Sequence, residues 1–119
     1  MVKVALLVLM AAVPLAAQAP VSGPAPPKGD AENGKKIYGA YGCYQCHNYA
    51  AHGGGAGPRL APGPLPYEPF RRYIREPTGQ MPPYTTKSLS DQEIADIYAF
   101  LRTIPAPPAV DSIPLLRKE

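Results

Sequence analysis

The sequence predicts a small all-α domain, and three observations lead to this fold class. Three segments, within residues 30–38, 68–76 and 90–104, carry the apolar spacing and the end signals of short helices. No stretch of useful length alternates apolar and polar residues as a half-buried strand does. All the aromatic residues, 8 Tyr and 2 Phe, lie between Tyr38 and Phe100, so we expect the core to lie there.

The first helix is predicted to begin at Asp30, a residue type that favours the N-cap position, with the acidic Glu32 in its first turn. Ile37 and Tyr38 follow as inward-facing residues, and Gly34 stands one turn before Tyr38. The segment therefore has a start signal and one apolar face.

The middle helix is predicted over Glu68–Glu76, with Pro69 in its first turn and Pro77 as the residue that stops it. Its apolar residues are Phe70, Tyr73 and Ile74.

The last helix carries the clearest signals. Ser90 and Glu93 have the spacing of a capping box, and Leu89 and Ile94 stand where a hydrophobic staple would form. The apolar residues follow the helical spacing i, i+3, i+4, i+7 and are Ile94, Ile97, Tyr98 and Leu101. Pro105 marks the end, and residues 50–66 and 76–88, between the helices, are predicted to be loops.

The two ends of the chain are predicted to lie outside the domain. Residues 1–19 have the profile of a signal peptide, with Lys3 before an uncharged apolar run and an A-x-A-like site ending at Ala19. Residues 20–28 read as a Pro/Ala-rich linker, 29–105 as the domain and 106–119 as a Pro-rich tail. We therefore expect a periplasmic protein, tethered to the membrane only if the N-terminal segment stays uncleaved. The apolar tail residues either lie along the domain surface or belong to a frayed end.

The composition limits how much core the side chains supply. With 17 Pro and 11 Gly among 119 residues, the chain is too short for a doubly wound α/β enzyme and suits one domain. Domains below about 80 residues usually need a disulfide, a metal or another internal staple. A net charge of only +3 does not indicate nucleic-acid binding. We expect something other than side chains to fill the middle of this domain.

The segment Cys43-Tyr44-Gln45-Cys46-His47 contains both cysteines and has the C-x-x-C-H spacing typical of covalent c-type haem attachment. On a helical turn, positions i and i+3 share a face, so two thiols reach the two vinyl groups of one porphyrin edge. The adjoining histidine then reaches the iron from the same side. The thioether bonds would supply the missing staple.

Three other readings of the same residues compete with haem. A redox-active C-x-x-C would need a βαβ context, which is absent from the pattern. A zinc site would need Cys43, Cys46, His47 and His52 to converge. A disulfide between Cys43 and Cys46 would close too small a loop to stabilise much.

With this motif and the downstream segment 79–84 (GQMPPY), the chain resembles a class I c-type cytochrome over residues 30–104. The downstream segment is similar to the Met-Pro-x-Tyr axial-ligand segment of that family, which consists of small monohaem electron carriers. The resemblance implies a small cytochrome c fold and one haem c bonded to Cys43 and Cys46. It further implies His47 and Met81 as the two iron ligands.

The segment 57–60 (GPRL) is similar to the Gly-Pro-x-Leu of the same family. The resemblance implies that the Pro58 carbonyl accepts a hydrogen bond from the ring nitrogen of His47 that does not face the iron. It also implies that Leu60 and Tyr84 line the haem pocket. It also implies that Gly34 and Tyr38 meet the last helix near Tyr98 and Leu101.

Residue counting favours Met81 independently. Of the 3 Met, Met1 and Met10 leave with the signal peptide, and Met81 lies on a Gly/Pro loop where it has no helix face to fill. His52 is the rival distal ligand. Because it follows His47 closely, on the proximal side, we expect a surface or loop histidine.

The basic residues of the middle helix, Arg71, Arg72 and Arg75, are predicted to form a solvated face. The functional alternative is docking to an acidic patch of a redox partner or holding a haem propionate.

These observations predict one-electron transfer with redox partner proteins such as a dehydrogenase, an oxidase or another cytochrome, and no enzymatic activity of the chain itself. The protein would be either a mobile carrier or the cytochrome subunit of a complex. One alternative is a haem-based ligand sensor or haem enzyme with Met81 displaced, and another is a Pro-rich secreted interaction domain without haem.

Overall fold

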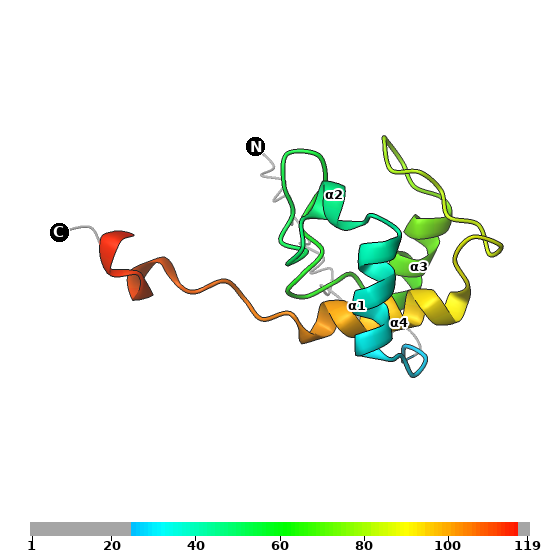
Figure 1. The fold of residues 1–119 in the computed structure, drawn as a ribbon, viewed down its shortest axis with the longest axis horizontal. Helices are drawn as coiled ribbons and strands as arrows, with labels where there is room; N and C mark the ends of the chain where they lie inside the picture. Colours follow the sequence, from blue (N-terminus) through cyan, green and yellow to red (C-terminus); the bar gives the residue numbers. More distant parts are fainter. Residues whose placement is uncertain (1–24, 117–119) are drawn as a thin grey trace, which may run out of the picture.

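The computed structural model describes residues 25–116, and every regular element within that range is helical (Figure 1). In chain order these are α1 (Ala31–Ala40), α2 (Tyr44–His47), α3 (Tyr67–Arg75), α4 (Asp91–Thr103), η1 (Val110–Ser112) and η2 (Pro114–Leu116). The predicted all-α fold class is confirmed. The predicted signal peptide and most of the linker lie outside the described residues.

The two strongest start signals act as the sequence predicts. The Asp30 side chain accepts from the backbone N–H groups of Glu32 and Asn33 at 2.9 and 3.1 Å, which caps α1. At α4, the Ser90 hydroxyl accepts from the Glu93 N–H, and the Glu93 carboxylate accepts from the Ser90 N–H at 2.7 Å. The capping box is therefore complete.

The first and last helices of the domain cross at close range, with α1 running across α4 in Figure 1. Gly34 lies in the crossing, where a Cβ atom would overlap the Asp96 carbonyl oxygen. Because glycine has no Cβ, the two backbones approach to a distance that any other residue would prevent. Ile37 and Tyr38 of α1 and Leu101 of α4 are buried beside this contact.

A buried carboxylate ties the start of α1 to α4. Asp96 is only 4 % exposed and accepts hydrogen bonds from the Asp30 N–H at 2.8 Å, from Asn33 Nδ2 at 2.7 Å and from Gln92 Nε2 at 2.9 Å. Burial by itself raises the pKa of the Asp96 carboxyl, but these donors outweigh it and hold the pKa below its usual value. A satisfied carboxylate thus fixes the register of the crossing.

Aromatic side chains pack α4 against α3 and against α1. The Tyr98 ring packs against Tyr67 and Phe70 with centroids 5.2 and 5.3 Å apart, and Phe100 packs on Tyr38 at 5.5 Å. Of the three apolar residues that the sequence marks in the middle helix, Phe70 and Ile74 are buried, whereas Tyr73 is 40 % exposed. The helix begins one residue earlier than predicted, and its first residue, Tyr67, supplies the buried ring.

Residues 48–66 and 76–90 contain no helix or strand, in agreement with the two predicted loops. The tail after α4 runs away from the helices in Figure 1, with the two short turns η1 and η2 at its far end. Its Leu115 side chain is 94 % exposed, so the tail leucines do not lie along the domain surface. No helix within residues 25–116 is long and apolar enough to cross a membrane.

Candidate haem-binding site

The single turn α2 presents the C-x-x-C-H motif. Cys43 is its N-cap residue, and the His47 N–H donates to the Cys43 carbonyl at 3.0 Å, so the motif is wound as one helical turn. No disulfide joins the two cysteines, and Cys43 is half-buried whereas Cys46 is exposed. The i, i+3 spacing on a turn is the arrangement that two thioether bonds to one porphyrin edge require.

His47 is buried and held through one ring nitrogen. Its Nδ1 lies 2.8 Å from the Pro58 carbonyl oxygen, which is the contact that the resemblance implied. Because a carbonyl only accepts hydrogen bonds, Nδ1 carries the proton and the lone pair of the neutral ring lies on Nε2. The structure therefore leaves Nε2 as the nitrogen able to bind a metal.

The loop after α2 folds back closely over the His47 ring. A Cβ at Gly57 would lie 2.8 Å from both His47 Nδ1 and the Cys46 carbonyl oxygen. Asn48, at φ 55°, turns the chain at the end of α2, and its side chain donates to the Gly53 carbonyl at 2.6 Å. This bracing by Asn48 was not predicted, because the sequence pattern does not reveal which loop carbonyl an asparagine reaches.

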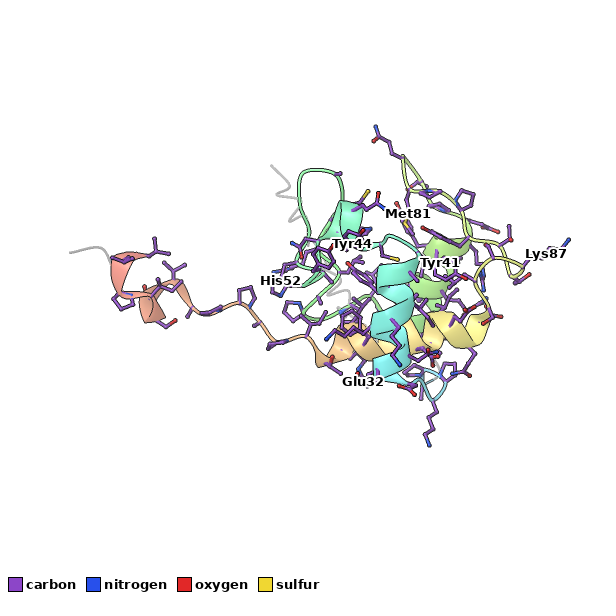
Figure 2. The ribbon with its side chains drawn as sticks, in the orientation of Figure 1. Glu32, Tyr41, Tyr44, His52, Met81 and Lys87 are labelled. Atoms are coloured by element: carbon purple, nitrogen blue, oxygen red, sulfur yellow. The ribbon has the colours of Figure 1, made fainter. Side chains whose placement is uncertain are left out.

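The second loop brings Tyr84 near the motif. The Tyr84 hydroxyl donates to the Tyr41 carbonyl at 3.4 Å, and the two rings are 6.0 Å apart. Burial raises the pKa of the Tyr84 phenol, and the nearby thiols of Cys43 and Cys46 raise it further. Tyr84 thus lies within electrostatic range of both cysteines. Figure 2 shows Met81 on the same loop, on the side of the molecule that also carries Tyr44 and Tyr41.

Half-buried apolar side chains lie in the motif, next to it in the sequence and in both loops. They pack against the buried core with one side and leave the other side uncovered, and they include Tyr41, Cys43, Tyr44, Leu60, Met81 and Tyr84. An apolar cofactor of porphyrin size would cover such a surface and remove it from water. The donor set fits as well, since an imidazole and a thioether are haem-iron ligands.

The competing readings of the cysteines fit the geometry less well. Burial raises the pKa of the Cys43 thiol, whereas a redox-active cysteine needs a lowered one. His52 Nε2 lies 3.3 Å from the Pro105 carbonyl oxygen, and Figure 2 shows its side chain away from Met81. Within residues 25–116, no three His, Cys, Asp or Glu side chains are grouped to hold a metal ion.

The three arginines that were predicted to form a solvated face of the middle helix are not all exposed. Arg72 is exposed, and Arg71 pairs with Glu68 at 3.0 Å, but the Arg75 side chain is only 13 % exposed. Its guanidinium reaches the second loop and α4 instead of solvent. Sequence reasoning missed this role because folding brings the acceptors of Arg75 near it, namely two backbone carbonyls and the Asp91 carboxylate.

The chain forms a short all-α domain with a C-x-x-C-H turn, and the histidine of that turn is fixed through Nδ1. These features are typical of a c-type cytochrome domain. The family model described as "Cytochrome C oxidase, cbb3-type, subunit III" matches residues 29–101, so the chain belongs to this family of c-type cytochromes. No curated protein and no solved structure gave a match. Family membership supports haem binding and haem-based electron transfer by this chain.

Proposed function

We propose that the protein is an exported one-electron carrier with a single haem c, attached through Cys43 and Cys46 and ligated by His47 and Met81. The observation that carries this proposal is the 2.8 Å contact between His47 Nδ1 and the Pro58 carbonyl oxygen. This contact holds the imidazole in the tautomer and orientation that a ligand to iron needs.

A bound haem would supply one-electron redox chemistry through the ferric and ferrous states of its iron. The residues of the chain determine the conditions of this transfer. His47 and Met81 would hold the iron from two sides of the chain, so that it exchanges electrons without binding a substrate. Leu60 and Tyr84, both half-buried, would exclude water from the ring and, together with a thioether ligand, favour the reduced state.

The ligand assignment is tested with Met81→Ala, using Gln80→Ala as the control, because Gln80 is the exposed neighbour in the same loop. We expect the ferric wild type and the control to show the weak Met-to-iron charge-transfer band, and their ferrous forms to bind carbon monoxide poorly. Met81→Ala should lose the band and bind carbon monoxide readily. An unchanged spectrum in Met81→Ala would refute the assignment. A wild type that already binds carbon monoxide would favour a haem sensor or enzyme.

The proposed location is the periplasm, and the proposed partners are redox proteins that donate or accept one electron. Residues 1–19 support export, because their apolar run follows a positive charge and ends near an A-x-A-like site. Fractionation of the native host and N-terminal sequencing of the mature protein test this, with a start near Pro20 as the expected result. Co-purification from the periplasmic fraction would distinguish a mobile carrier from a complex subunit. Recovery of the full-length chain in the cytoplasm would contradict the proposal.

A further inference from the structure

Arg75, the last residue of α3, spans the base of the loop that carries Met81. Its Nη1 donates to the Tyr84 carbonyl at 2.8 Å and to the Leu89 carbonyl at 2.6 Å. Its Nη2 donates to Asp91 Oδ1 at 2.6 Å. One guanidinium therefore joins the end of α3, the far end of the loop and the start of α4.

The neighbouring residues of α3 hold the same loop. The Tyr84 N–H donates to the Ile74 carbonyl at 3.0 Å, so consecutive residues of α3 fix both polar groups of the Tyr84 backbone. At the near end, the Tyr73 hydroxyl donates to the Thr78 carbonyl at 2.7 Å. Residues 79–83 thus form a short arch between two fixed points.

Met81 stands inside this arch and is only half-buried. It lies outside any helix or strand, and the preceding Gly79 has φ 94°, so regular structure does not fix its position. The position of the Met81 sulfur therefore depends on the two ends of the arch and on the packing of its side chain against the core. Of the contacts at those ends, the ones made by Arg75 carry a full charge, which makes hydrogen bonds stronger.

The Arg75 side chain is largely buried, and its hydrogen bonds to Tyr84, Leu89 and Asp91 hold it in place. Its Nε–H is buried without a partner among the described residues, which costs free energy. The side chain nevertheless stays in place, because two carbonyls and one carboxylate engage the other nitrogens of the guanidinium. A surface arginine such as Arg72 on the same helix makes no comparable set of contacts within the residues described.

We propose that Arg75 is the positioning residue for Met81, holding the arch 79–83 closed so that the thioether stays on the iron. This inference rests on the proposed function, in which Met81 is the distal ligand. Arg75 acts through the Tyr84 and Leu89 carbonyls and does not touch the iron. Without it, the arch would open more often and expose the distal coordination position to small ligands.

The test compares Arg75→Met with Arg72→Met, an exposed arginine on the same helix, in the haem-loaded protein. The readouts are the charge-transfer band of the ferric form, the rate of carbon monoxide binding to the ferrous form and hydrogen exchange at the Tyr84 amide. We expect Arg72→Met to match the wild type. Arg75→Met should bind carbon monoxide at least about tenfold faster, since a single hydrogen bond to a charged group is worth that much. Its Tyr84 amide should exchange faster as well.

A second control separates positioning from general destabilisation. Gly34→Ala weakens the α1 and α4 crossing without touching the arch, so it should lower stability without the tenfold change in carbon monoxide binding. Arg75→Lys keeps the charge and should give an intermediate rate, and it decides the question if Arg75→Met fails to fold. The role of Arg75 would be overturned if Arg75→Met or Arg75→Lys bound carbon monoxide at the wild-type rate. It would also be overturned if Gly34→Ala raised that rate as much as Arg75→Met does. A wild type without the band would instead overturn the ligand role of Met81.

Discussion

Gly57 is the residue at which the first loop passes closest to the proposed iron ligand. The adjacent Pro58 supplies the carbonyl that fixes His47, so the backbone at this point both touches and orients the imidazole. A side chain here would have to displace either the ring or the Cys46 carbonyl. The orientation of the His47 ring therefore depends on position 57 having no Cβ atom.

This dependence predicts the effect of Gly57→Ala. The added Cβ would lie 2.8 Å from His47 Nδ1, and such overpacking costs about 1–3 kcal/mol of unfolding free energy. A weaker contact between Pro58 and His47 would also make the imidazole a poorer donor to iron and raise the reduction potential. Denaturant unfolding and redox titration of the haem-loaded protein measure the two effects.

Gly55→Ala is the matched control, because a Cβ at Gly55 in the same loop meets nothing within 4 Å. It should leave both the unfolding free energy and the potential close to wild type. Equal effects at positions 55 and 57 would show that loop flexibility, and not contact with His47, determines the outcome.

At the scale of elements, the contact between α1 and α4 organises the domain. The helices meet through Gly34, the Asp96 hydrogen bonds fix their register, and Ile37 and Leu101 are buried at the contact. No hydrogen bond within residues 25–116 joins these residues to His47 or Met81. The crossing instead provides the support from which α2 and the two loops extend.

The close crossing predicts that Gly34→Ala is strongly destabilising. Its Cβ would overlap the Asp96 carbonyl oxygen, which belongs to the α4 backbone and cannot turn aside as a side chain does. We expect a loss of about 3 kcal/mol, the upper end of what overpacking usually costs, in thermal or denaturant unfolding.

Gly39→Ala in the same helix supplies the comparison, since a Cβ at Gly39 meets nothing within 4 Å. Alanine favours a helix interior over glycine by up to about 1 kcal/mol, so this variant should be slightly more stable than wild type. If Gly34→Ala also gained stability, the close approach of the two helices would be wrong.

The elements themselves were largely predictable because their signals are local. Asp30 and the Ser90 and Glu93 pair mark helix starts through contacts within one turn, and the structure forms those contacts. The outward position of Tyr73 and the inward position of Arg75 were not predictable. Both depend on where the second loop lies, which sequence spacing alone does not specify.

At the scale of the molecule, the candidate site was predictable where a motif fixes the spacing and unpredictable where folding brings distant segments together. The C-x-x-C-H motif predicts the roles of Cys43, Cys46 and His47, and the resemblance to a family added Pro58, whose contact with His47 the structure forms. The resemblance also implied Tyr84, whereas its hydrogen bond to the Tyr41 carbonyl comes only from the structure. The ligand role of Met81 stays a prediction, and so do the periplasmic location and the redox partners.

The size of the side-chain core leads to the last prediction. Within residues 25–116, the largest completely buried side chains are Ile94 and Leu101, and apolar residues such as Tyr44 and Leu60 stay half-buried. A covalently held haem would cover such side chains while bonded to the chain. We therefore predict that Cys43→Ala/Cys46→Ala, which lacks both thioether bonds, loses haem during purification and unfolds at lower temperature with a broader transition. Calorimetry and the absorption spectrum provide the measurement. Cys46→Ala alone keeps one bond at Cys43 and should lie between the double variant and wild type. A colourless double variant that melted as sharply and at the same temperature as wild type would show that the side chains suffice as a core, and that the haem adds function without adding stability.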